Sequence, residues 1–285
     1  MKSKHSLLIV TVTTVSTVFV AGCAMFGNTN HRASNVMQYL YPKDSQHTDT
    51  PTVPVLSLPL KVGIAFVPEE QSRSQGGLAS FSEKQKMTLM KEVSAHFKKY
   101  PFVQSIELIP SAYLTPKGGF ANLDQLRSMF GVDVITLLSY DQVQFTDEGL
   151  LSLTYWTVVG AYVVRGEKND TKTMMDAVVY DVASRKLLFR APGTSQIKAA
   201  ATPINLSEQL RRDSDLGFNQ AATNMVANLQ EELQSFRERV KSSPTEFKVV
   251  AKPGYKGGGS LGGLDLLMLA GMGSFFLWLR KTRPA

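Results

Sequence analysis

Two apolar segments, one at each end, limit how much of this 285-residue chain can fold as a water-exposed domain. Residues 7–20 follow Lys2 and Lys4, and they are too few to span a bilayer, which takes about 20 apolar residues. Residues 261–279 are followed by three basic residues and are long enough to span. About 200 residues remain between the two segments, which is enough for one well-packed core.

The N-terminal segment has the order of a signal peptide, with a basic start, an apolar run and small residues before a cysteine. It ends in Val20-Ala21-Gly22-Cys23, which resembles the lipobox of bacterial lipoproteins. The resemblance implies cleavage between Gly22 and Cys23 and acylation of Cys23. It also implies export to the outer membrane, because Ala24 and not aspartate follows. Several acyl chains anchor a protein stably, so membrane lipid is an expected partner.

Cys23 is the only cysteine, which excludes an intramolecular disulfide and a cysteine-rich metal site. The chain has 31 Lys and Arg against 24 Asp and Glu, a net charge of +7. Much of that excess lies in the two terminal segments, and the remainder is too small to indicate a nucleic-acid partner.

Between Cys23 and the first apolar strand pattern, the chain is polar and interrupted by Pro42, Pro51 and Pro54, as is typical of a tether. One apolar patch, residues 36–41, interrupts this pattern. It is compatible with docking on the domain or with a single helical turn.

The middle of the chain alternates between strand and helix patterns in the order β-α-β-α-β-β-β-β-α. Strands are predicted at 55–67, 103–109, 132–145, 151–165, 173–181 and from 187, and helices at 82–99, 122–130 and from Asn205. The order predicts an α/β or α+β domain in two layers, a mixed sheet with helices packed on it. Over about 140 residues the order is similar to small periplasmic lipoprotein domains of the curli-secretion lipoprotein and of peptidoglycan-synthase activators, with no shared motif.

Three local signals fix the helix ends in this scheme. Ser82 with Gln85 predicts a capping box, and Gly131 a C-terminal cap. Asn205, with Glu208 three residues later, predicts the cap of the last helix. The apolar stripe of that helix favours packing on the sheet over an intermolecular coiled coil; it comprises Ala222, Val226, Leu229, Leu233, Phe236 and Val240.

No residue set in the middle of the chain has the spacing of a catalytic or metal site. Nucleophilic catalysis needs a histidine in the folded body, where only His96 stands, and a boundary position explains it more simply. Glu69 and Asp213 are interpreted as solvated charges. We therefore expect no catalytic residue, metal or cofactor, and a protein that is not an enzyme. A hydrolase with paired carboxylates is the less favoured alternative.

The C-terminal segment begins with Gly257, Gly258, Gly259 and Ser260 and continues as an apolar span to Arg280. The basic end marks the cytoplasmic side, in agreement with a signal peptide that exports the domain. Asp265 and four glycines within the span make it a weak permanent anchor. The run Gly257-Gly258-Gly259 before the span is followed by Ser260. Because it lacks the Gly-Lys-Ser/Thr of a phosphate loop, it is not predicted to bind phosphate.

This tail resembles the GlyGly-CTERM sorting signal, which a rhomboid-family intramembrane protease, rhombosortase, handles. Together with the lipobox it makes the chain similar to the rhombotarget lipoprotein family. The resemblance implies removal of the tail within Gly257–Ser260 and display at the cell envelope. An ordinary C-terminal transmembrane helix is the alternative.

The expected organisation follows from these signals. It comprises a signal peptide (1–22), a flexible tether (23–54), an α/β domain (55–245), a linker with the cleavage region (246–260) and a transmembrane sorting tail (261–285). The expected function is that of a non-catalytic envelope lipoprotein with a partner-binding domain. Signal peptidase and a rhomboid-family protease would process it, and an envelope protein would be its partner. The alternative is an accessory subunit of an envelope secretion or assembly complex, although residues 132–165 offer only one long hairpin.

Overall fold

The computed structural model describes residues 28–42, 52–69, 82–148, 167–202, 204–243 and 245–255, which have a mixed α/β fold. The strands are β1 (Asn28–Ala33), β2 (Val55–Leu58), β3 (Leu60–Phe66), β4 (Val103–Ile109), β5 (Val134–Glu148), β6 (Glu167–Asp181), β7 (Leu187–Ala201) and β8 (Lys248–Ala251). The helices are α2 (Val36–Leu40), α3 (Glu83–Phe97), α4 (Gly119–Phe130) and α6 (Leu206–Ser242), with a 3-10 turn at Ser111–Tyr113.

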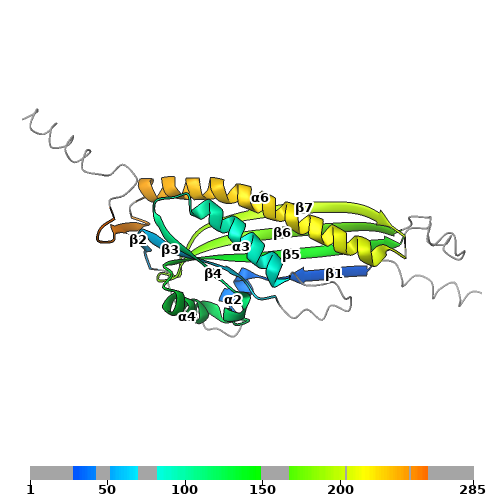
Figure 1. The fold of residues 1–285 in the computed structure, drawn as a ribbon, viewed down its shortest axis with the longest axis horizontal. Helices are drawn as coiled ribbons and strands as arrows, with labels where there is room; N and C mark the ends of the chain where they lie inside the picture. Colours follow the sequence, from blue (N-terminus) through cyan, green and yellow to red (C-terminus); the bar gives the residue numbers. More distant parts are fainter. Residues whose placement is uncertain are drawn as a thin grey trace, which may run out of the picture.

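The large sheet is mixed, as the sequence predicts. Its strands run in the order β4-β3-β5-β6-β7. β3 pairs in parallel with β4 and β5, whereas β5, β6 and β7 form an antiparallel meander. β1 pairs with β5 beyond the end of β3, so β1 and β3 lie end to end along one side of β5. β2 and β8 form a separate parallel pair (Figure 1).

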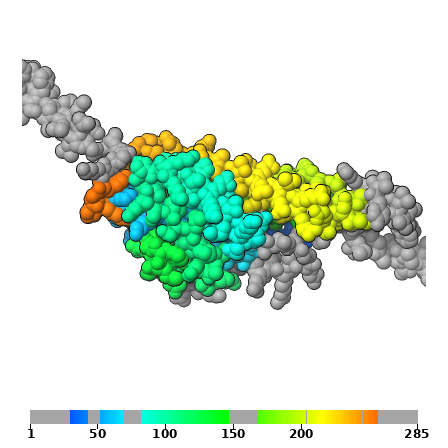
Figure 2. Space-filling model, viewed as in Figure 1, coloured from blue at the N-terminus to red at the C-terminus, as the bar shows by residue number. Residues whose placement is uncertain are grey.

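Helices cover both faces of the sheet, so this part of the molecule has three layers and the prediction of two layers is wrong. One core lies between the sheet and the helices α3 and α6. A second core lies on the opposite face, beneath α2 and α4. Figures 1 and 2 show α3 and α6 side by side along the long dimension of the molecule. The sequence does not reveal the second core because a helix pattern does not say which face of a sheet the helix covers.

Two of the three predicted helix caps are confirmed. The Ser82 hydroxyl accepts from the Gln85 amide and the Gln85 side chain accepts from the Ser82 amide, which is a complete capping box. Gly131 has φ 65, the left-handed conformation of a C-cap. The prediction for Asn205 is wrong in its chemistry. Its side-chain oxygen accepts from the amide and hydroxyl of Thr202, in the turn before α6.

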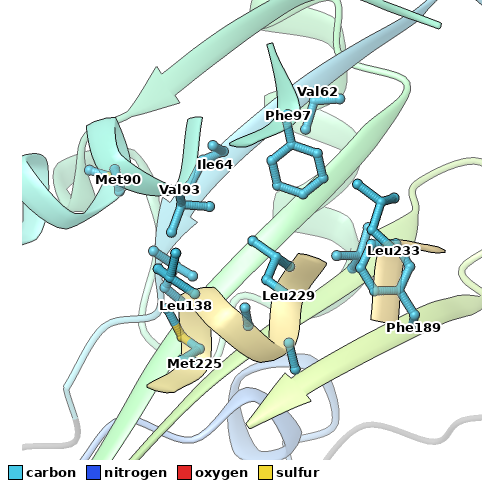
Figure 3. Packing of buried hydrophobic residues seen from close by; sticks show 14 of the residues in the cluster. Val62, Ile64, Met90, Val93, Phe97, Leu138, Phe189, Met225, Leu229 and Leu233 are labelled. Atoms are coloured by element: carbon cyan, nitrogen blue, oxygen red, sulfur yellow. The ribbon is translucent and has the colours of Figure 1, made fainter. Parts of the chain in front are cut away.

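The long helix α6 rests on the sheet in two different ways. At 37 residues it extends about 55 Å. In its second half Met225, Leu229 and Leu233 pack against β3, β5, β7 and α3 (Figure 3), and the predicted packing on the sheet is confirmed. In its first half, polar contacts with β5 add to the apolar packing of Phe218 and Ala221. Gln142 donates to the carbonyl of Ser214 at 3.1 Å, and Gln144 to that of Leu210 at 2.9 Å.

The segment expected as a tether contributes two elements to the fold. β1 adds to the sheet, and α2 buries Val36, Tyr39 and Leu40. Both interpretations of residues 36–41 are therefore confirmed, since the segment is a short helix and docks on the domain. The predicted strand 151–165 lies outside the described residues. Within the part of the chain that is described, no helix combines the length and apolarity needed to cross a membrane.

Candidate functional site

The parallel strands create a crevice where β3 and β4 end. The chain leaves β3 for α3 on one face of the sheet and leaves β4 for α4 on the other. Where neighbouring parallel strands send their connections to opposite faces, a crevice opens at their carboxyl ends, and ligands of α/β proteins bind in such places. A cavity of about 560 Å³ lies here, lined by Asn35, Gln38, Tyr39, Pro68, Glu69, Pro116 and Lys117.

The helix α2 forms one wall of this cavity, and several hydrogen bonds hold it there. The Asn35 side chain caps the helix by accepting from the amides of Met37 and Gln38. Before the helix, the Ser34 amide donates to the Tyr140 carbonyl, and the Tyr140 amide donates to the Ser34 hydroxyl. These bonds fix α2 against β5, so the wall is part of the folded domain.

The opposite wall is the loop before α4, and Asn122 holds its shape. The Asn122 side-chain oxygen accepts from the Thr115 amide at 2.9 Å and from the Tyr39 hydroxyl at 2.7 Å. Its nitrogen donates to the Tyr113 carbonyl. Burial raises the pKa of Tyr39, so its phenol stays protonated as a donor at neutral pH. Lys117, at the cavity, has φ 59, a conformation that a residue with a side chain adopts only where its surroundings enforce it.

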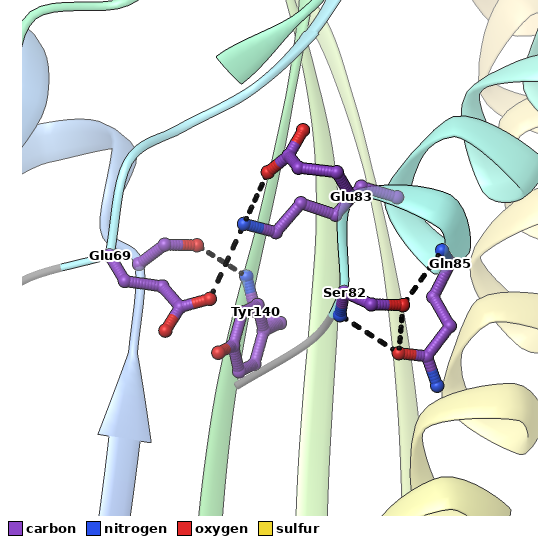
Figure 4. A network of polar contacts seen from close by, with 7 residues as sticks. Glu69, Ser82, Glu83, Gln85 and Tyr140 are labelled. Carbon is purple, nitrogen blue, oxygen red and sulfur yellow. Dashed lines mark hydrogen bonds and ion pairs between the residues drawn. The ribbon is translucent and has the colours of Figure 1, made fainter. Parts of the chain in front are cut away.

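The charges beside the cavity come from the segment after β3, from α3 and from the loop before α4. The buried Lys86 ammonium lies 3.4 Å from Glu69 and 3.2 Å from Glu83 (Figure 4). Burial, and then the negative charge of Glu69, raise the pKa of Tyr140. Glu69 and Lys117 both line the cavity, and the Glu69 carboxylate is paired with Lys86. The expectation that Glu69 is a solvated loop charge is therefore wrong.

A second, smaller cavity of about 390 Å³ lies on the other side of Asn35. Its lining includes the pair Asp176 and Arg190, with Arg190 Nε donating to Asp176 Oδ2 at 2.6 Å. Burial raises the pKa of Asp176, and the hydrogen bond and charge of Arg190 oppose that shift. Burial also raises the pKa of Tyr180, another lining residue, to about 12. Both cavities therefore share the segment 33–39 as a wall.

The structure does not describe the site residues predicted from the sequence. Gly22, Cys23 and the processing region Gly257, Gly258, Gly259 and Ser260 lie outside the described residues. His96 lies in the contact between α3 and α6, 2.5 Å from Gln230, on the face away from α2. Burial, then the positive charge of Lys99, lower its pKa. Across the described ranges, no group of three or more His, Cys, Asp or Glu is placed to hold a metal ion.

The residues that form the cavities were not among the site residues predicted from the sequence. A signal existed for two of them, since Lys117-Gly118-Gly119 before a predicted helix is a dense turn sequence and Asn35 precedes an apolar patch. Asp176 and Arg190 gave no signal. Their contact depends on the pairing of two strands, which no local pattern shows.

Comparison with known proteins shows no close relative. No protein-family model matches the chain, and no curated protein matches it in sequence. A Helicobacter pylori protein described as a neuraminyllactose-binding hemagglutinin homolog covers 72% of this chain and 97% of its own, at 9% identity and a TM-score of 0.35. A PelC variant from Paraburkholderia phytofirmans, solved as a dodecamer, covers 72% of this chain and 96% of its own, at 9% identity and a TM-score of 0.27. A hypothetical protein of Chlamydia trachomatis covers 64% of this chain and 95% of its own, at 13% identity and a TM-score of 0.23. TM-scores this low support no conclusion about function.

Proposed function

We propose that this chain is an envelope lipoprotein, acylated at Cys23, whose folded body is a non-catalytic partner-binding domain. The observation that carries the proposal is the position of α2. The segment 33–39, which begins ten residues after Cys23, contributes to the walls of both cavities. In this proposal the lipid-proximal part of the chain forms the binding surface, so membrane anchoring and partner binding are linked through β1 and α2.

The proposal includes removal of the C-terminal tail. The segment 261–285 would span the inner membrane during export, and a rhomboid-family protease would cut within Gly257–Ser260. The glycines and Asp265 of the tail support a temporary span over a permanent one. β1 and β8, the described elements nearest the two terminal segments, lie toward opposite ends of the molecule (Figure 1). An acyl anchor at one end then makes a second anchor at the other unnecessary.

The chemistry of the cavities supports binding over catalysis. Lys86, the buried amine beside the larger cavity, forms ion pairs with two carboxylates, those of Glu69 and Glu83. The Tyr39 hydroxyl already donates a hydrogen bond to the side-chain oxygen of Asn122. The polar groups thus serve to orient a ligand by hydrogen bonds and charge.

Intact-mass spectrometry of the membrane fraction tests the processing. The expected mass is that of a chain beginning at an acylated Cys23 and ending within Gly257–Ser260. An unacylated N-terminus, or a chain that retains 261–285, would contradict it. A Cys23→Ala variant expressed with an ordinary cleavable signal sequence is expected in the soluble fraction after tail removal. If that variant stays in the membrane without its tail, the lipid is not the anchor.

One observation favours a second candidate, an accessory subunit of an envelope secretion or assembly complex. β5, β6 and β7 are each 15 residues long and extend well beyond the region covered by α2 and α4 (Figure 1). Their buried face in the extended region is polar and carries Gln142, Gln144, Thr171 and Thr173. Co-purification of stoichiometric membrane partners with the acylated protein would favour this role.

A further inference from the structure

The smaller cavity contains a buried carboxylate oxygen without a hydrogen-bond donor. Asp176 is 8% exposed, and its Oδ2 accepts from Arg190. Its Oδ1 is buried and has no partner among the described residues. A buried acceptor without a donor costs free energy, and a ligand that supplies the donor recovers it. Asp176 therefore provides a reason for a donor group to bind in this cavity.

Arg190 offers the complementary chemistry beside that oxygen. Its side chain is half exposed, and only Nε is engaged in the bond to Asp176. A guanidinium carries five N–H donors, so others remain to bind an acceptor. The pair thus presents an acceptor and donors next to each other at the lining of one cavity.

This arrangement discriminates between ligand charges. An ammonium bound to Asp176 would lie close to the guanidinium of Arg190, and a carboxylate bound to Arg190 would lie close to Asp176, and like charges repel. A neutral amide meets neither penalty. Its N–H can donate to Asp176 Oδ1 while its carbonyl accepts from Arg190.

Apolar side chains from three elements line the same cavity. Met37 of α2, Met174 of β6 and Leu187 at the start of β7 are 58%, 40% and 43% exposed. Large apolar side chains that gather around a few polar groups are typical of binding sites. These residues favour an amide flanked by apolar side chains, as in a polypeptide.

We propose that the smaller cavity binds an apolar peptide segment of a partner protein through one backbone amide, whose N–H donates to Asp176 and whose carbonyl accepts from Arg190. The inference rests on the proposed partner-binding function and names the partner chemistry. The segment's flanking apolar side chains contact Met37, Met174 and Leu187.

The test uses the mature acylated protein in lipid nanodiscs, with its methionine methyl groups labelled with carbon-13. The probe is the blocked peptide acetyl-Ala-Leu-Ala-N-methylamide. Its addition is expected to shift the methyl resonances of Met37 and Met174. Met129 on α4 is 62% exposed and does not line the cavity, so its resonance should stay in place. If neither Met37 nor Met174 moves at millimolar peptide, the proposal is wrong.

Ester analogues of the peptide test whether the amide is the group recognised. Ester analogues that replace one amide N–H at a time keep the apolar side chains but lose a donor. One of them is expected to bind about tenfold more weakly, because a hydrogen bond to a charged group is lost. Equal affinity of all the analogues would overturn the proposal without any mutation of the protein.

The variant Asp176→Asn is expected to lose most of this preference for amide over ester. The matched control is Asp170→Asn, on the same strand and sheet face but outside the cavity lining, which should keep the preference. An Asp176→Asn protein that retains the full preference would contradict the assignment.

Peptide binding and acylation are independent readouts. An unacylated Cys23 with intact peptide binding would disprove the anchor alone, and an acylated protein without binding would disprove this site.

Discussion

At the scale of single residues, Asn122 holds the two walls of the larger cavity together. We expect Asn122→Ala to lower the free energy of unfolding by about 3 kcal/mol, because the Tyr39 hydroxyl and the Thr115 amide both lose their acceptor. Urea denaturation measures this difference. Tyr39→Phe removes only one of the two donors and should cost about 1 kcal/mol. Equal costs for the two variants would mean that Asn122 does not connect α2 with the loop.

Asp213 gives a prediction for pH. Its Oδ2 is buried without a partner in the described chain, and burial raises its pKa more than Gln209 and Arg212 lower it. Because the pKa is higher in the folded state, ionised Asp213 costs stability at neutral pH, and the cost disappears as pH falls through the folded pKa toward 3.8. The expectation of a solvated Asp213 is wrong, since the residue is 1% exposed.

Asp213→Asn should therefore raise the free energy of unfolding at pH 7, and its advantage over the wild type should shrink as the solution is acidified. Urea denaturation at a series of pH values measures this trend. The neighbouring Asp215→Asn, at an exposed position, is the control and should change stability by less than about 0.5 kcal/mol. An advantage that does not change with pH would show that ionisation of Asp213 is not its source.

At the scale of elements, Gly193 sets how closely α6 approaches β7. A Cβ at this position would lie 2.2 Å from both the Ala221 carbonyl oxygen and the Met225 nitrogen. Gly193→Ala should push the helix away from the sheet and lower the free energy of unfolding by about 3 kcal/mol. Thermal unfolding measures the loss, and Thr194→Ala, at an exposed position, is the control. Wild-type stability in Gly193→Ala would contradict this close packing.

At the scale of the whole molecule, the N-terminal segment decides whether the domain is complete. Deletion of residues 28–41 removes β1 and the buried side chains of Val36, Tyr39 and Leu40. At roughly 1.5–3 kcal/mol for each large side chain, we expect the free energy of unfolding to fall by about 5 kcal/mol. Deletion of residues 24–27 alone should leave it unchanged. If the two deletions are equivalent, residues 28–41 act only as a tether.

Much of the fold could be read from local patterns. Ser82 with Gln85 and Gly131 mark helix ends through bonds within a few residues, and the apolar stripe of α6 predicts a helix on a sheet. The Asn205 cap fails because its side chain binds Thr202, an equally local partner that competes for the same oxygen. Local patterns thus identify elements well but do not settle which of two nearby donors a side chain takes.

The sequence by itself determined most of the described strands and helices from β3 to α6, because hydrophobic period and caps act over a few residues, but it did not reveal β1, α2 as part of the domain, or β8. The two apolar terminal segments and the single Cys23 can also be read directly from the sequence. Only the tertiary structure decided that α2 and α4 cover the face opposite α3 and α6, and that Asp176 meets Arg190. That contact depends on the register of β6 and β7, which shifts between Val179 and Tyr180. Register is set by the turn and by packing of the whole sheet, so residues that are unremarkable in the sequence become neighbours in a cavity.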